Sequence, residues 1–272
     1  MKIVLINKAN HEDFKIVLPL RKLPEKNRYT LGAYNDEGVV AGAISFYLAK
    51  DRYEIDWLYV APSMRRRGAA TILLNQIYLF IRDTGEIYPI HAQYEVTEKE
   101  LSLYGFFLSR TEMDTSFSHD RYYVSPQKLS AVFGHKVSLE NGIEDRNFFS
   151  LQSGMQNMII SEMASENGYL IQDRNSWKGE CVPELCRVLC KHEKFFSAVF
   201  IMTREDGDLE LSYLYSKNPE STNAIVSRVG ADLITKYPKS KLIFDAVGVG
   251  SKLMAKKLFP DAIKVCIYES VW

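Results

Sequence analysis

The sequence predicts a mixed α/β, or α+β, protein whose largely antiparallel sheet is flanked by helices. Hydrophobic runs typical of strands alternate with segments of helical periodicity along the chain. In addition, residues 43–62 and 198–219 share one plan: a strand, a charged turn, a strand that ends in an aromatic residue followed by Leu-Tyr, and then a proline. Tyr59 and Tyr215, which match in this plan, are 156 positions apart. We therefore expect two tandem copies of one fold, the alternative being a chance likeness between two hairpins.

The composition is that of an ordinary globular protein without net charge. Of the 272 residues, 46% are hydrophobic and 25% are charged, and 34 Lys and Arg balance 34 Asp and Glu. A general nucleic-acid binder usually carries a basic excess, so we expect no nucleic-acid partner. The apolar runs fall short of the ~20 residues of a membrane span, and the N-terminus lacks the apolar core of a secretion signal. We expect a cytoplasmic protein without a membrane partner, and the sequence does not predict the oligomeric state.

In the first half, strand-like runs alternate with helical segments. The turn-forming residues 35–38 lie between two strand-like runs, which indicates a β-hairpin. Apolar residues at helical spacing follow Ala69, and Gly85 is typical of a helix end. The predicted elements are strands at 2–6, 29–34, 39–49, 52–60, 86–94 and 114–124, and helices at 11–24, 69–85 and 97–106.

The second half begins near Gly142 with two segments that resemble helices. Asp206-Gly207 is a strong turn signal between two strand-like runs. The predicted elements are helices at 144–168, 182–195, 222–237 and 251–259, a strand hairpin at 196–216, and strands at 241–247 and 262–272. The predicted domains are therefore residues 1–128 for the N-terminal copy and residues 140–272 for the C-terminal copy.

Three of the four cysteines lie close together, at positions 181, 186 and 190 near His192. Their spacing is not the paired C-x-x-C pattern of a zinc site. Cys186 and Cys190 are four positions apart, which places them on one face of the predicted helix 182–195. Buried thiols are therefore expected, in a reducing compartment, and we predict no metal site and no disulfide framework.

The segment VAPSMRRRGAAT, residues 60–71, joins a predicted strand to a predicted helix. The first backbone N–H groups of a helix have no internal partners, and the helix dipole favours an anion there. Gly68 and Ala70 are small enough for a phosphate to approach the backbone, and residues 65–67 add three arginines. The pyrophosphate of a nucleotide-like cofactor fits this pattern. The alternative is a solvated, basic start of a helix.

The same segment resembles the acyl-CoA signature of the GNAT superfamily of acyltransferases. In that signature a strand ending in Val is followed by Gln or Arg, two residues, Gly, one residue, and Gly or Ala; Arg65, Gly68 and Ala70 match it. The order of strands and helices over roughly residues 1–125 is also similar to the family. The resemblance implies that acetyl-CoA binds as cosubstrate. Adding 156 to the signature positions gives Ser221, Ala224 and Val226 without a glycine, so we expect a degenerate second copy and one cofactor site.

The resemblance also implies which residues hold the cofactor. In the family, backbone groups of the strand before the loop pair with the pantetheine arm, and one N–H polarises the thioester carbonyl. The loop and the helix start surround the pyrophosphate. The residues expected to bind the cofactor are Leu58, Tyr59, Val60, Arg65, Arg66, Arg67, Gly68, Ala69, Ala70 and Thr71.

Acyl transfer to an amine needs a base, and the strand that leads into the loop offers two carboxylates. Glu54 and Asp56 are two apart on a predicted strand and share a face. Glu54 is the first candidate because several family members carry their base there, and Asp56 is the second. The family's acid is a Tyr four residues before a Gly-Phe pair, but this sequence has Leu101 there. Tyr104, nearly on the same helix face, is the candidate replacement or a packing residue.

These residues predict an N-acetyltransferase that moves an acetyl group from acetyl-CoA to a small-molecule or peptide amine by direct attack on the thioester. The alternative is a non-catalytic, acyl-CoA-binding regulatory protein. The missing tyrosine and the degenerate second copy keep this alternative open.

Overall fold

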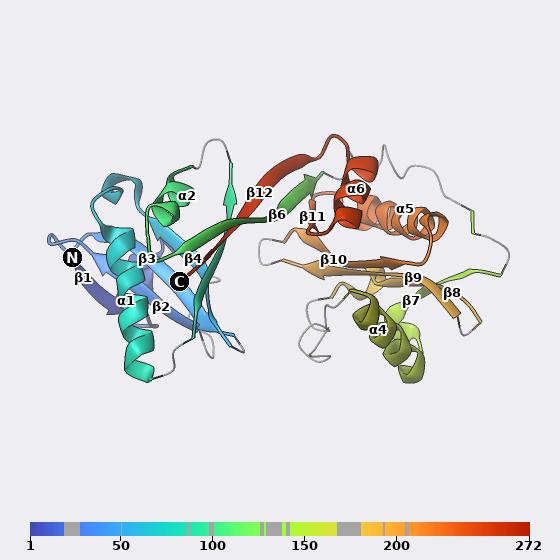
Figure 1. The fold of residues 1–272 in the computed structure, drawn as a ribbon, viewed down its shortest axis with the longest axis horizontal. Helices are drawn as coiled ribbons and strands as arrows, with labels where there is room; N and C mark the ends of the chain where they lie inside the picture. The colour runs from blue at the N-terminus through green and yellow to red at the C-terminus, as the bar shows by residue number, and fades with distance from the viewer. Residues whose placement is uncertain are drawn as a thin grey trace. The chain divides into compact units, whose positions relative to one another are not determined.

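The computed structural model describes residues 1–18, 28–49, 51–85, 88–97, 101–125, 128, 138–139, 142–167, 181–192, 194–204 and 207–272. The chain forms two compact units (Figure 1). Unit 1 contains Met1–Ser118 together with Cys266–Trp272, and unit 2 contains His119–Val265. The expected boundaries, 1–128 and 140–272, did not assign the last seven residues to the N-terminal unit.

Unit 1 is a sheet in the order β1-β2-β3-β4-β5-β12-β6, in which β4 and β5 are parallel and the other described pairs are antiparallel. The helix α1 packs on one face and buries Leu73, Leu74 and Ile77 against β-strand side chains. The elements are β1 (Lys2–Leu5), a 3-10 turn (His11–Phe14), β2 (Arg28–Tyr34), β3 (Val40–Leu48), β4 (Tyr53–Val60), α1 (Ala69–Thr84), β5 (Ile90–Val96), α2 (Leu101–Leu108), β6 (Asp114–Val124) and β12 (Ile263–Val271).

Unit 2 is a sheet in the order β6-β11-β10-β9-β8-β7, to which β6 contributes its second half. Figure 1 shows α5 and α6 on one face of this sheet and α4 on the other. The elements are β7 (Glu144–Asn147), α4 (Ser153–Asn167), β8 (Arg187–Lys191), β9 (Lys194–Thr203), β10 (Leu209–Ser216), α5 (Pro219–Lys236), β11 (Leu242–Ala246) and α6 (Val249–Leu258), with 3-10 turns at Phe148–Ser150 and Pro183–Leu185.

The repeat predicted from the hairpins is confirmed in detail. Every residue of β4 has its counterpart 156 positions later in β10, and the two strands share one burial pattern. The pairing of each strand with its preceding neighbour is interrupted at equivalent positions, Asp56 and Ser212. Both strands also pair in parallel with the following strand over three residues only. Such shared irregularities indicate two copies of one fold rather than two unrelated hairpins.

The prediction of a helix at 182–195 is wrong, because this segment is a 3-10 turn followed by β8. Cys186, Val188 and Cys190 face one core cluster, whereas Leu185 and Leu189 face another. Residues four apart share a face in a strand as well as in a helix, so the spacing of Cys186 and Cys190 fitted both structures. Burial on both faces then removes the alternation that would have marked the strand.

The helix predicted at 144–168 begins later than expected. Residues Glu144–Asn147 form β7, which pairs with β8, and α4 starts only at Ser153. The side chain of Asn147 caps the intervening turn by accepting a hydrogen bond from the Phe149 N–H at 2.8 Å. An edge strand of four residues is too short to show a periodicity of its own.

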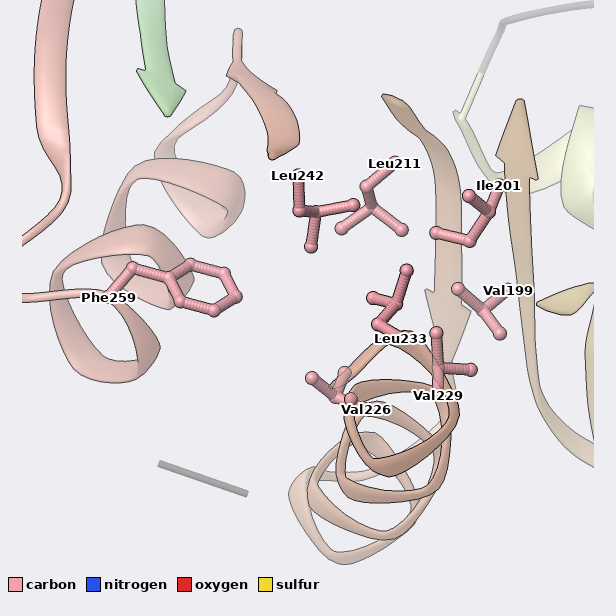
Figure 2. A pocket seen from close by; sticks show the side chains of 9 residues that line it. Val199, Ile201, Leu211, Val226, Val229, Leu233, Leu242 and Phe259 are labelled. Carbon is pink, nitrogen blue, oxygen red and sulfur yellow. The ribbon is translucent and has the colours of Figure 1, made fainter. Parts of the chain in front are cut away.

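The core of unit 2 has a small apolar cavity between α5 and the sheet. Figure 2 shows Val229 and Leu233 of α5 opposite Val199 and Ile201 of β9. The cavity measures ≈ 20 Å³ and its lining is almost wholly apolar. A space of this size could hold about one water molecule, but it offers no polar partners for one.

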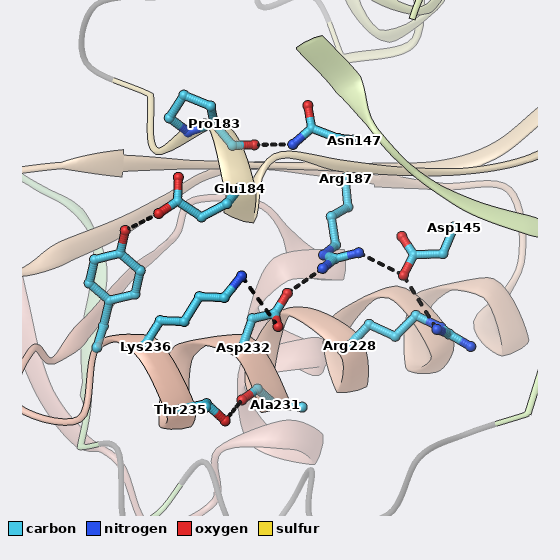
Figure 3. Close-up of polar contacts among 11 residues, drawn as sticks. Asp145, Asn147, Pro183, Glu184, Arg187, Arg228, Ala231, Asp232, Thr235 and Lys236 are labelled. Carbon is cyan, nitrogen blue, oxygen red and sulfur yellow. Dashed lines mark hydrogen bonds and ion pairs between the residues drawn. The ribbon is translucent and has the colours of Figure 1, made fainter. Parts of the chain in front are cut away.

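A polar network ties α5 to the edge of the same sheet (Figure 3). Arg187 of β8 donates to Asp145 of β7 at 2.8 Å and also contacts Asp232 of α5, while Arg228 contacts Asp145 at 3.3 Å. Although burial opposes the charge of Arg187, these carboxylates raise its pKa. Nearby, burial and the hydrogen bond to Glu184 raise the pKa of Tyr237 to about 12. This network is structural, since it satisfies charges at a sheet edge.

Candidate functional site

The edge of β4 becomes available where β5 diverges from it. The parallel pairing ends at the pair Ile55 and Ala92, although β4 continues to Val60. On the other side, the Ala61 N–H donates to the Ala41 carbonyl at 2.9 Å. Because backbone groups alternate along an antiparallel strand, those of Leu58 and Val60 point to the edge that β5 has left. This is the edge at which the cofactor's pantetheine arm was expected.

The loop after β4 leads to a helix start that has no side-chain cap. Gly68 precedes α1 with φ 85°, and Arg66 also lies in the left-handed region with φ 60°. The first backbone hydrogen bond of the helix runs from Ile72 N to Gly68 O, 3.0 Å. The N–H groups of residues 69–71 therefore have no intrahelical partner. A Cβ added at Gly68 would meet nothing within 4 Å, so a phosphate can approach this backbone.

The three arginines of the loop have different surroundings. Arg65 folds back onto its own strand, where its Nε donates to the Val60 carbonyl at 3.2 Å and its guanidinium lies 5.7 Å from the centre of the Tyr59 ring. Arg66 and Arg67 are exposed. Arg65 thus holds the loop against β4, and the other two arginines offer mobile positive charge beside the helix start.

In the second copy there is no loop at the equivalent place. The helix α5 begins at Pro219, directly after β10, and the side chain of Asn218 accepts a hydrogen bond from Ser221 N at 2.8 Å. The equivalence by 156 positions therefore ends with the strand, and Ser221, Ala224 and Val226 are buried residues of α5 rather than loop residues. Pro219 has no N–H, and Asn218 satisfies another donor, so this helix start is closed to an anion.

The two predicted base candidates lie near each other and each has an arginine partner. Glu54 forms an ion pair with Arg52, and Asp56 forms one with Arg28 at 2.9 Å. Burial, and then the negative charges of Glu54 and Asp56, raise the pKa of Tyr47 above its usual value. Glu54 lies between Tyr53 and Ile55, which belong to the core under α1, so it points to the opposite face.

Sequence reasoning missed a histidine on the same face. His91 of β5 is paired in register with Glu54, and its neighbours Ile90 and Ala92 belong to the core under α1. Its Nδ1 lies 3.1 Å from Glu269 Oε1, and the two side chains are 15% and 29% exposed. Glu269 is 178 positions away in the sequence, on β12, so no local pattern could have indicated this pair.

Tyr104, the predicted acid, lies on α2 in the core of unit 1. Its ring centre is 4.7 Å from that of Tyr268, and the residue is half-buried against the cluster under α1. These contacts are those of a packing residue. Its role as an acid therefore stays a prediction.

Unit 2 contains a second histidine–carboxylate pair. His119 Nε2 lies 3.2 Å from Asp245, to which Arg121 donates two hydrogen bonds of 2.7 Å. Burial alone would raise the pKa of Asp245, but the hydrogen bonds from Arg121 and His119 outweigh it and hold that pKa well below its usual range. Within the described parts of the chain, no group of three or more metal-ligating side chains comes together. No described helix is long and apolar enough to cross a membrane.

Comparisons with known proteins agree with this geometry. Residues 6–107 match the family model of the acetyltransferase (GNAT) family. No curated protein sequence matches the chain. Solved structures resemble it at low identity and therefore inform on the fold.

A tandem GNAT protein from the clavulanic acid biosynthesis pathway is similar over 99% of this chain and 97% of its own, with a TM-score of 0.67 and 9% identity. A GCN5-related N-acetyltransferase from Sphaerobacter thermophilus is similar over 88% and 79%, with a TM-score of 0.60 and 12% identity. The glucosamine N-acetyltransferase region of a fungal multi-domain β-N-acetylglucosaminidase is similar over 100% of this chain and 38% of its own, with a TM-score of 0.61 and 11% identity. The β4 edge, the uncapped start of α1 and the similarity to a tandem GNAT structure together show that the chain has a tandem GNAT fold, and residues 6–107 match the model of the GNAT acetyltransferase family.

Proposed function

We propose that the protein is an N-acetyltransferase that moves an acetyl group from acetyl-CoA to a small-molecule or peptide amine by direct attack on the thioester. The observation that supports this most strongly is the edge of β4 that β5 leaves after Ile55, followed by the uncapped start of α1. The pantetheine arm would pair with residues 58–60 and the pyrophosphate would lie against residues 65–71. Glu54 and Asp56 would face the acceptor amine, and Tyr104 would be the acid. The four free cysteines fit a cytoplasmic, reducing location.

The runner-up is a regulatory protein that binds acyl-CoA without turning it over. One observation favours it: both carboxylates on β4 already have guanidinium partners. This function requires the same loop but no proton acceptor.

Two measurements separate these functions. Calorimetric titration with acetyl-CoA should give one binding site per chain, because α5, the counterpart of α1 in the second copy, begins with a side-chain cap. Thiol release from acetyl-CoA should then appear with at least one amine among glucosamine, spermidine, lysine and a peptide with a free N-terminus. Binding without thiol release supports the regulatory function, absence of binding contradicts both, and a stoichiometry near two contradicts the single site.

A further inference from the structure

The second copy serves as an internal comparison for the residues near the proposed acetyl group. Both copies have the same strand geometry around the divergence of β4 from β5 and of β10 from β11. Only the first copy has a loop and helix start open to a phosphate. Polar residues that occur in both copies are therefore explained by the fold, whereas those confined to the first copy need another reason.

By this comparison, Glu54 is explained by the fold, because the second copy also has a glutamate at this place. Its counterpart 156 positions later is Glu210, which forms an ion pair with Arg204 at 2.7 Å beside the hairpin turn, as Glu54 does with Arg52. A glutamate–arginine pair thus occurs at this place in both copies, including the one whose helix start is capped. Arg204 lies across the hairpin from Glu210, whereas Arg52 lies two residues before Glu54, so each pair is explained by attraction between charges beside the turn.

His91 differs in this respect. In the first copy it is the register partner of Glu54, and in the second copy the register partner of Glu210 is Ile243. Ile243 is buried with 1% exposure, so the fold accepts an apolar residue at this place. A half-buried histidine in the first copy, held by a glutamate from the last strand of the chain, is therefore not a requirement of the sheet.

The contact with Glu269 fixes how the imidazole can act. An ionised carboxylate only accepts hydrogen bonds, so Nδ1 must carry the proton that it shares with Glu269 Oε1 at 3.1 Å. In the neutral ring, Nε2 is then the nitrogen with a free lone pair. The same carboxylate stabilises the imidazolium that forms when Nε2 takes up a proton.

From this arrangement we infer that His91 is the general base of the N-terminal unit and that Glu269 is its positioning residue. The inference rests on the proposed acetyl transfer. As the amine nitrogen bonds to the thioester carbonyl carbon, its proton passes to His91 Nε2, and the C–S bond breaks with its electron pair on sulfur. The thiolate takes a proton from Tyr104, the acid of the proposed function, and leaves as the thiol, and the proton of the imidazolium returns through water to the Tyr104 phenolate. The site is thus incomplete without β12, although the β12 residues lie at the far end of the sequence.

The kinetic test uses the full chain and the amine that gives the fastest thiol release. His91→Gln should lower kcat by about two to four orders of magnitude while acetyl-CoA affinity stays unchanged. Glu269→Gln should give a smaller fall in kcat. Added imidazole should restore part of the rate in His91→Ala, which a merely structural role would not explain. His119→Gln, which alters the other histidine–carboxylate pair, is the control and should turn over normally.

A second measurement does not depend on activity. Long-range nitrogen–proton NMR spectra of the imidazole should show the Nδ1–H tautomer for His91 in the wild type, and this preference should be lost in Glu269→Gln. The inference is overturned if His91 is the Nε2–H tautomer, or if His91→Gln turns over normally while Glu54→Gln or Asp56→Asn does not. In the latter case the proposed function still stands. A wild type without acetyl-CoA binding contradicts the proposed function instead.

Discussion

At the scale of single residues, Gly68 gives the sharpest test of the cofactor loop. Gly68→Glu should abolish acetyl-CoA binding, because its carboxylate would lie where the pyrophosphate is expected. The residue is exposed and an added Cβ meets nothing within 4 Å, so the only structural cost is the backbone at φ 85°. That cost is of order 1–3 kcal/mol. Calorimetry with acetyl-CoA and a thermal melt of the variant check the two expectations.

Gly85 provides a matched control for this substitution. It ends the same helix with φ 76° and also has open space around an added Cβ. Gly85→Glu therefore carries the same backbone cost but places its charge at the opposite end of α1. It should melt slightly below Gly68→Glu, because the helix dipole disfavours a negative charge at the C-terminal end, and it should bind acetyl-CoA normally. Equal loss of affinity in both variants would show that strain, and not the position of the loop, determines binding.

A second residue-scale prediction concerns acid stability and Asp245. Its pKa is lowered in the folded protein by Arg121 and His119 despite burial. A carboxylate whose pKa is lower in the folded than in the unfolded protein stabilises the fold at pH values above the unfolded pKa of about 4. This stabilisation is lost as the pH falls from about 4 through the folded pKa. Asp245→Asn should therefore flatten the fall in unfolding free energy below about pH 4, measured by urea titration at several pH values. Asp36→Asn, with a side chain 93% exposed, should follow the wild type.

At the scale of elements, the two equivalent helices begin in different ways. Asn218 caps α5, whereas Gly68 leaves α1 without a side-chain cap. Asn218→Ala should lower the unfolding free energy by roughly 0.5–2 kcal/mol, because the N–H of Ser221 loses its acceptor. Denaturant unfolding with acetyl-CoA titration checks this, and cofactor affinity should not change. A change in affinity would contradict the assignment of the cofactor to unit 1 alone.

At the scale of the whole molecule, we expect the stability of unit 1 to depend on its final strand, β12. β12 pairs with β5 from Cys266 to Val271, and Ser270 lies 3.0 Å from the Tyr94 hydroxyl and 2.9 Å from that of Thr115. Trp272 exchanges two backbone hydrogen bonds with Ile90. Removing Cys266–Trp272 takes away a central strand of this sheet, which should expose the edges of its neighbours.

A chain that ends at Val265 should therefore lose hydrogen-exchange protection in β4 and β5 and should not bind acetyl-CoA. The single substitution Trp272→Ala is the milder control, since it removes the ring stacked on Tyr78 at 5.3 Å but keeps the backbone pairing. For the same reason, residues 1–128 alone should be unstable. A truncated chain that keeps both protection and cofactor binding would show that unit 1 does not need its last strand.

The sequence by itself determined the features that depend on neighbouring residues. The hairpins, the helix α1 and the loop around Gly68 are local patterns, and the repeat spacing of 156 follows from comparing two of them; the structure contains all of these features. The periodicity of hydrophobic residues, turn residues and helix caps depends on residues a few positions apart. These features can therefore be recognised in the sequence before the tertiary structure is known. The same locality explains the error at β8, where a strand buried on both faces shows the spacing of a helix.

Only the tertiary structure decided which distant segments share a sheet. It placed Cys266–Trp272 in unit 1, brought Glu269 to His91 across 178 positions, and paired Asp56 of β4 with Arg28 of β2. Strands pair through backbone N–H and C=O groups, which nearly every residue carries. The side chains of β12 therefore do not indicate with which strand it pairs. The candidate residues of the loop could therefore be read from the sequence, whereas the His91–Glu269 pair exists only because the fold inserts its last strand beside β5.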